Sequence, residues 1–209
     1  MLVKTYCAAV NGLDVTTVTI EVSLTKGVMF RMTGLGDTAV REGRDRMAAA
    51  LVNNGYLFPN ADITVNMAPA DLRKEGSGFD LSLAIGVLAA SKQIEPVGLD
   101  RIMLVGELGL DGALQPVKGA LPIAMRAKAD GFVALVVPQQ NVREAAVVEG
   151  IRVYGMSQMK EVISMITGQE RFQPVSVDTR KEFYDQQYST ELDYADVRGQ
   201  QQVKRALEV

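Results

Sequence analysis

Ser77 and Lys118 are of residue types that could together support nucleophilic chemistry. A serine hydroxyl becomes a nucleophile when a base, such as a lysine amine, lies within hydrogen-bond reach of it. A Ser77–Lys118 dyad would therefore predict a serine peptidase, and Lys74 and Glu75 fall in the same polar loop as Ser77. Two structural interpretations stand beside it. Ser77 could cap the helix expected to follow it, or the start of that helix could bind an anion.

The sequence lacks histidine and has one cysteine, Cys7. Ser–His and Cys–His pairs and the usual zinc sites are therefore excluded, and Cys7 is expected to be a small core residue. Glu107 and Asp111 flank a predicted hairpin, where two carboxylates could act in acid–base chemistry or bind a metal, but an Asp before a Gly is also ordinary in a turn. No phosphate-binding loop of the required spacing occurs, so we expect no nucleotide site in this chain. Because histidine is absent, we expect no metal site either.

Three arginines, Arg41, Arg44 and Arg46, alternate with Glu42 and Asp45. Ion pairing along one helix is the plain explanation. The alternative is a helix face that contacts phosphates. We therefore keep Arg41 and Arg44 as candidate binding residues.

The composition is that of one compact domain with additional segments: 209 residues, of which 47% are hydrophobic, and a net charge of −3. That charge predicts no attraction of the whole surface to nucleic acid, which leaves only a local basic patch as a DNA contact. The start lacks the features of a signal peptide, and the longest apolar runs are too short to span a membrane. We therefore expect a cytoplasmic protein without a membrane partner, which a single cysteine also favours.

Runs rich in Val, Thr and Ile predict strands at Val3–Val10 and Val15–Leu24, joined by a hairpin turn at Asn11-Gly12. Further strands are expected at Val28–Met32, Ile63–Met67, Phe132–Val137 and Ile151–Tyr154, and a strand pair at Arg101–Leu110 and Ala113–Gln115.

Helices are predicted where apolar residues recur at helical spacing. The first, Thr38–Asn54, begins at the cap Asp37 and ends at Gly55. The second, Phe79–Ser91, is apolar nearly all round and should be a buried central helix. Others are expected at Ala120–Ala129, at Val142–Val148 and, capped by Ser157, at Met159–Ile166. Because strands and helices interleave, the fold class is α+β or two-layer α/β, with a mixed sheet and packed helices.

The composition changes after Gly168. Residues 169–194 are polar and charged and are expected to form a linker. A helical pattern then begins near residue 195, and its apolar stripe continues to the last residues without a stop signal. We therefore expect this chain to be a piece of a longer protein.

Several segments, in register over residues 2–168, resemble the ComM/YifB family of magnesium-chelatase-like AAA+ ATPases. They are Gly34–Glu42, Ile63–Ser77, Phe79–Gly86, Gly106–Gly112 and Pro116–Pro122. Arg73 stands where the family usually has proline. By this resemblance, residues 1–168 form a Lon-protease-like (ChlI-type) domain, with the fold also seen in domain 2 of a ribosomal small-subunit protein. Residues 195–209 would then be the first helix of a AAA+ module.

The same resemblance places the catalytic columns of Lon on this chain. Lys74-Glu-Gly76 matches the residues before the Lon nucleophile, whose own column receives Gly78. The column of the Lon lysine base receives Leu121, which cannot accept a proton. A one-residue gap would restore Ser77 as the nucleophile, with Lys118 roughly one helical turn before the base column. The resemblance therefore predicts a domain without peptidase activity.

The resemblance also implies a role. Full-length family members are expected to be hexameric, ATP- and Mg²⁺-dependent DNA motors that act as helicases in branch migration during natural transformation. This domain would help to assemble the ring or guide DNA, while Lys74 and Glu75 would form a solvated loop or contact DNA, the ATPase ring or a neighbouring subunit. The alternatives are the Ser77–Lys118 peptidase and a chelatase-like ATPase that remodels a protein partner.

Overall fold

The computed structural model describes residues 2–12, 14–178 and 197–207. The chain divides into two compact units, Met1–Ser176 and Val177–Val209, which are described separately. Most of the predicted linker, residues 179–194, lies outside the described residues. So do residues 195–196 and 208–209 of the predicted C-terminal helix.

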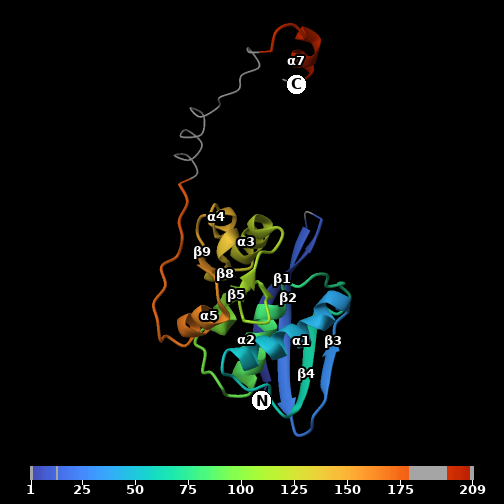
Figure 1. The fold of residues 1–209 in the computed structure, drawn as a ribbon, viewed down its shortest axis with the longest axis vertical. Helices are drawn as coiled ribbons and strands as arrows, with labels where there is room; N and C mark the ends of the chain where they lie inside the picture. The colour runs from blue at the N-terminus through green and yellow to red at the C-terminus, as the bar shows by residue number, and fades with distance from the viewer. Residues whose placement is uncertain (1, 13, 179–196, 208–209) are drawn as a thin grey trace. The chain divides into compact units, whose positions relative to one another are not determined.

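A mixed sheet of seven strands, in the order β3-β4-β2-β1-β5-β8-β9, organises the first unit (Figure 1). Its strands are β1 (Leu2–Asn11), β2 (Asp14–Thr25), β3 (Phe30–Thr33), β4 (Asp62–Ala68), β5 (Ile102–Leu104), β8 (Ala134–Pro138) and β9 (Arg152–Met156). The pairs β1–β2 and β2–β4 are antiparallel, and the remaining pairs are parallel. This arrangement confirms the predicted mixed α/β class.

The predicted N-terminal hairpin is confirmed. β1 and β2 pair in register from Leu2 opposite Ser23 to Asn11 opposite Asp14. Gly12 in the turn has φ of +63°, a conformation that glycine adopts readily. Cys7 is fully buried in β1, and burial raises the pKa of its thiol to about 12, as expected of an inert core residue.

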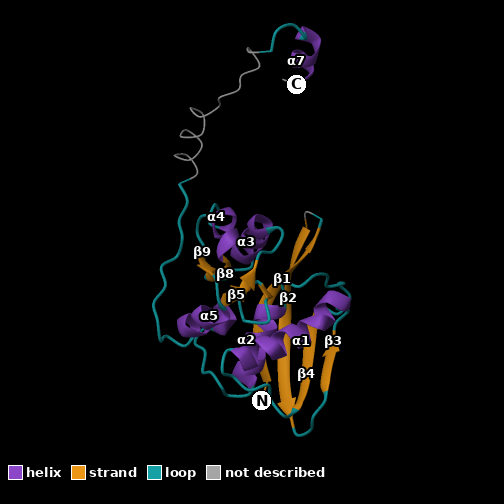
Figure 2. Cartoon of the chain, viewed as in Figure 1, coloured by secondary structure: helices purple, strands orange, loops and turns teal. Residues whose placement is uncertain are grey.

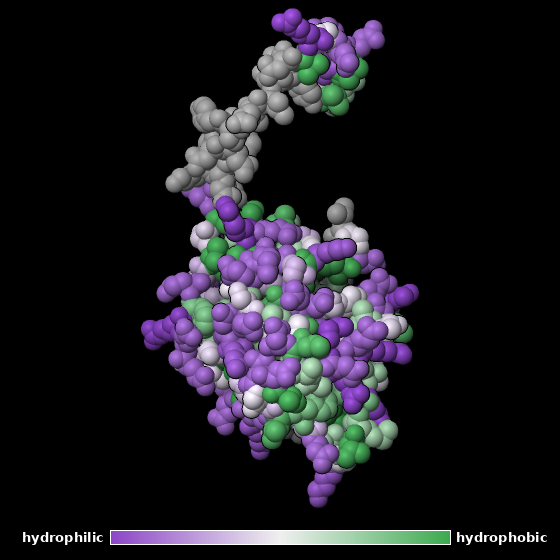
Figure 3. Space-filling view, in the orientation of Figure 1, coloured by the Kyte–Doolittle hydropathy of each residue, from purple (hydrophilic) through white to green (hydrophobic). Residues whose placement is uncertain are grey.

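Helices pack against this sheet (Figure 2). They are α1 (Thr38–Asn53), α2 (Asp80–Ala90), α3 (Ala120–Ala129), α4 (Val142–Ala145) and α5 (Met159–Ile166), with short 3-10 turns η1 (Leu99–Arg101) and η2 (Gln139–Asn141). Every residue of α2 is buried, because α2 lies between α1 and strands β1 and β2. The predicted central helix is thereby confirmed. The face of the molecule drawn in Figure 3 is mainly hydrophilic, and its apolar residues gather toward the lower end.

Two local predictions need correction. The expected strand pair is confirmed in part, because β6 (Glu107–Leu108) pairs antiparallel with β7 (Leu114–Gln115) across Asp111-Gly112, but the first part of the expected strand Arg101–Leu110 is a separate strand, β5, in the large sheet. The strand breaks because the Gly106 N–H donates to the Gly78 carbonyl at 2.9 Å, so the chain turns toward the start of α2. Gln158, not Ser157, caps α5, in a reciprocal capping box with Glu161.

In the second unit the described helix is α7 (Gln201–Leu207). Within it no residue is buried, and the apolar side chains Val203 and Leu207 are exposed. Across the described part of the chain, no helix is both long and apolar enough to cross a bilayer.

Candidate functional site

A pocket of about 540 Å³ lies where the start of α1, the loop before α2 and the ribbon of β6 meet β1. It is lined by Ala8, Val10, Asp37, Glu75, Gly76, Ser77, Gly78, Phe79, Val105, Glu107, Pro116, Val117, Lys118 and Ile123. The pocket thus brings the predicted site residue Lys118 together with Glu75 and Ser77, which come from a loop far earlier in the sequence. Its volume is in the range of small-ligand sites.

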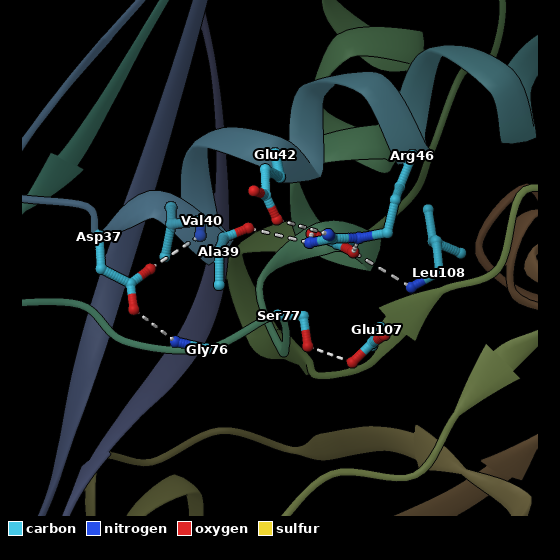
Figure 4. A network of polar contacts seen from close by, with 10 residues as sticks. Asp37, Ala39, Val40, Glu42, Arg46, Gly76, Ser77, Glu107 and Leu108 are labelled. Carbon is cyan, nitrogen blue, oxygen red and sulfur yellow. Dashed lines mark hydrogen bonds and ion pairs between the residues drawn. The ribbon is translucent and has the colours of Figure 1, made fainter.

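The Ser77 hydroxyl donates a short hydrogen bond to the Glu107 carboxylate (Figure 4). The expectation that Ser77 caps α2 is wrong: the cap position is Phe79, and no side-chain hydrogen bond caps this helix. The Ser77 carbonyl, rather than its hydroxyl, accepts from the Asp80 N–H at 3.2 Å. The serine therefore has a proton acceptor, but it is a carboxylate on β6 and not a lysine.

Asp37 joins the start of α1 to the loop that carries Ser77. One carboxylate oxygen accepts from the Val40 N–H at 2.8 Å, which is the predicted helix cap, and the other accepts from the Gly76 N–H at 3.3 Å (Figure 4). The Asp37 N–H donates to the Lys74 carbonyl at 3.0 Å. One residue thus fixes both the helix start and the serine loop.

Lys74 is fully buried, so the expectation of a solvated lysine is wrong. Its ammonium donates to the Pro69 carbonyl, within the same loop. Burial lowers the pKa of Lys74, because the charged form loses water contacts, and the charge of Asp71 opposes this effect in part. Glu75, by contrast, is exposed and forms a surface ion pair with Arg73 at 3.0 Å.

Next to this pocket's loop, the Arg46 guanidinium of α1 donates two hydrogen bonds, of 2.7 and 3.1 Å, to the Asp80 carboxylate of α2. Asp80 is fully buried and also accepts from the Leu108 N–H at 3.3 Å, which ties α1, α2 and β6 together. Burial raises the pKa of Asp80, and Arg46 offsets part of that rise. Our sequence reading missed this pair. The sequence contains a signal for a buried ion pair: Asp80 is the only charged residue in the mainly apolar segment Phe79–Ser91.

Gly78 and Leu121, the positions that the sequence analysis matched to the catalytic residues of Lon, carry no side-chain group that could act as a nucleophile or a base. Gly78 has no side chain, and its carbonyl accepts from Gly106 N–H and from the Cys7 thiol. Leu121 lies at the start of α3, where its N–H donates to Glu144 at 2.9 Å. Lys118 is exposed at the pocket rim.

Arg41 and Arg44 are both exposed on α1. The Arg44 guanidinium lies over the rings of Phe30 and Phe58, at 5.5 and 5.9 Å from their centroids. The predicted ion pairing along the helix is confirmed for Arg46, whose guanidinium is 4.0 Å from Glu42 one turn earlier.

Comparison with known proteins identifies the chain's relatives. The model of the family described as subunit ChlI of Mg-chelatase matches residues 20–141. The chain is 37% identical to competence protein ComM of Haemophilus influenzae over 98% of its length, and 38% identical to protein YifB of Escherichia coli over 96%. It covers 40% and 39% of these relatives, so it spans about two fifths of their length. It is also 26% identical to Lon protease 2 of Bacillus subtilis over 50% of this chain and 19% of that protein.

Proposed function

Because the chain belongs to the family of the Mg-chelatase subunit ChlI, we propose that it is a non-proteolytic accessory domain of a longer AAA+ motor that acts on DNA. The domain spans residues 1–168 and has a Lon-like fold, residues 169–194 are a linker, and residues 195–209 begin the ATPase module. ATP and Mg²⁺ are bound by that module, and the full-length protein assembles as a hexamer. The domain helps to assemble the ring or guides DNA or a partner.

The observation that carries the non-proteolytic assignment is the Ser77–Glu107 hydrogen bond. In a serine–lysine peptidase the hydroxyl needs an amine as its base. Here the base column holds the aliphatic Leu121, and the serine donates to a carboxylate instead.

DNA contact is assigned to α1 rather than to the pocket. The pocket lining carries the carboxylates of Asp37, Glu75 and Glu107 against one ammonium, Lys118, so its charge disfavours phosphate. Arg41 and Arg44 are exposed on α1 and can reach a phosphate backbone. The name of the Haemophilus relative, a competence protein, favours DNA processing.

The test uses the full-length protein, with and without residues 1–168. DNA binding and oligomeric state are measured by anisotropy and analytical ultracentrifugation. Deletion is expected to weaken DNA binding, ring assembly or both, and if it changes neither, the accessory role is wrong. ATPase stimulation by branched DNA, compared with protein partners, separates a DNA motor from a chelatase-like remodelling ATPase.

A charge reversal locates the DNA contact within the domain. The double variant Arg41→Glu/Arg44→Glu is expected to weaken DNA binding and reduce its salt dependence. Lys128→Glu/Lys160→Glu, at exposed positions of α3 and α5, makes the same change of net charge and is the matched control, which should leave both unchanged. Equal losses in the two variants would exclude a specific contact through α1.

A serine peptidase is the second candidate, because Ser77 and Lys118 line the same pocket. The discriminating experiment is labelling by a fluorophosphonate probe, followed by casein hydrolysis. Labelling that is lost in both Ser77→Ala and Lys118→Met would establish the dyad. The accessory role predicts no labelling of the wild-type chain at concentrations that label an active serine peptidase.

A further inference from the structure

A second cavity, of about 440 Å³, lies between the end of α5 and the half of the sheet formed by β5, β8 and β9. α5 lies beside this half of the sheet in Figure 1. The lining is mainly apolar and includes Val97, Ile102, Ala134, Tyr154, Met165 and Ile166. A cavity of this size with an apolar lining and a few polar groups is typical of small-molecule sites.

The sheet register places Arg152 on the face of the sheet that forms the floor of this cavity. Ile102 of β5, Ala134 of β8 and Arg152 of β9 are direct neighbours across three parallel strands. Tyr154 is two residues further along β9, and all four residues line the cavity. Because side chains alternate between the two faces of a strand, these four leave the sheet on one face, and the buried Val153 leaves it on the other. The Arg152 side chain therefore starts from the cavity floor.

The wall opposite the sheet is held in place by backbone hydrogen bonds. The Val97 N–H donates to the Ile166 carbonyl at the end of α5 at 2.8 Å, and the Gly168 N–H donates to the Met165 carbonyl at 3.2 Å. These carbonyls therefore already have donors and do not require one from a ligand. Val97 lines the cavity and is 74% exposed, so an apolar ligand in the cavity would remove its side chain from water.

The charged residues in the lining of this cavity are two arginines, Arg101 and Arg152, and no carboxylate from the described residues joins them. Both arginines are exposed, and neither guanidinium forms an ion pair or a hydrogen bond within the described part of the chain. Asp100, which precedes Arg101, is outside this lining. A guanidinium binds a carboxylate or a phosphate through parallel hydrogen bonds. The unpaired charges of the cavity therefore favour a ligand with an anionic group.

We propose that this cavity binds a small aliphatic anion, with its chain on Ile102 and Ile166 and its carboxylate or phosphate head at Arg152 and Arg101. The site shares no lining residue with the pocket that contains Ser77, and it does not rest on the proposed motor function.

The test compares four probes that share a short linear alkyl chain: hexanoate, hexyl phosphate, 1-hexanol and hexylammonium. Each is titrated into the ¹⁵N-labelled 209-residue chain. Saturable shifts are expected in the amides of residues 97–102, 133–134, 152–154 and 165–168, with both anions binding more tightly than the alcohol and the ammonium most weakly. The tighter of the two anions identifies the head group. Shifts that map elsewhere, no saturable shift, or an alcohol or ammonium that binds as tightly as the anions would overturn the proposal.

Two double variants check the role of the arginines. Arg101→Gln/Arg152→Gln removes two exposed charges and is expected to weaken binding of the anions roughly tenfold while leaving the alcohol unchanged. Lys26→Gln/Lys160→Gln, also at exposed positions, makes the same change of net charge and is the matched control, which should leave all four affinities unchanged. Unchanged anion affinity in the arginine variant, or equal losses in the two variants, would contradict binding of the head group by these arginines.

Discussion

A side chain at position 43 would occupy the space of the Asp80 carboxylate: an ideal Cβ on Gly43 falls 2.4 Å from Asp80 Oδ1. Gly43 is buried in the middle of α1, and this close approach lets Arg46 of the same helix bind Asp80. The packing of α1 on α2 therefore depends on a glycine in a helix interior, where glycine is otherwise unfavourable.

Gly43→Ala is expected to lower the free energy of unfolding by about 1–3 kcal/mol, because the added methyl displaces the buried carboxylate. This loss exceeds the gain of about 1 kcal/mol that alanine brings to a helix. Urea denaturation measures the difference. Asp45→Ala, at an exposed position of α1, is the control and should stay within about 0.5 kcal/mol of wild type. A Gly43→Ala variant more stable than wild type would contradict this packing.

The Asp80 carboxyl should make stability depend on pH in a defined direction. Because its pKa is raised in the folded state, the folded protein binds this proton more tightly than the unfolded chain does. The contribution of this carboxyl to stability is complete below its ordinary pKa of 3.8 and is lost as pH rises through the raised pKa of the folded state. Relative to Asp80→Asn, wild type should therefore lose stability as pH rises from that value. Urea unfolding of both proteins at several pH values measures the trend, and the opposite slope would show that Arg46 outweighs burial.

Lys74 should be replaceable by a residue of similar shape. Lys74→Met is expected to change the free energy of unfolding at pH 7 by no more than about 1 kcal/mol, because the lost hydrogen bond is offset by removing a buried charge. Lys74→Ala should cost about 2–4 kcal/mol, because it leaves a cavity. Thermal or urea unfolding distinguishes the two, and equal losses would mean that the ammonium itself stabilises the loop.

Lys92 follows the C-cap of α2 with φ of +60°, a left-handed backbone conformation that disfavours a side chain. This strain predicts a stabilising substitution. Lys92→Gly should raise the free energy of unfolding by about 1 kcal/mol, since glycine adopts the left-handed conformation without a Cβ clash. Lys160→Gly, in the first turn of α5, should have the opposite effect, because glycine loses more conformational freedom than lysine when it becomes helical. Urea denaturation of both variants measures the contrast. A loss of stability in Lys92→Gly would show that contacts of the lysine side chain outweigh the backbone strain.

The elements that were predicted well carry their signals locally. Asp37 and Gly55 mark the ends of α1, and its Val40, Met47 and Leu51 stripe is buried. The apolar run from Leu81 identifies α2 as central before any contact is known. Caps, turns and periodicity act over a few residues, so a single sequence contains them.

The features that were missed depend on partners distant in the chain. Gly106 leaves the predicted strand because its hydrogen-bond partner is Gly78. Ser77 donates to Glu107, thirty positions away. Lys74 is polar in sequence but lies where the folded loop closes over it. These hydrogen bonds and this burial depend on how distant elements pack together, and residue spacing alone does not specify them.

The two-oxygen attachment of Asp37 has a mechanical consequence. The helix that presents Arg41 and Arg44 begins on the same carboxylate that holds the Gly76 N–H. A tilt or shift of α1, as binding a rigid polymer would impose, must either carry the serine loop with it or break one of these hydrogen bonds. Movement of the helix that carries Arg41 and Arg44 is therefore coupled, through the two hydrogen bonds of Asp37, to the shape of the pocket that contains Ser77.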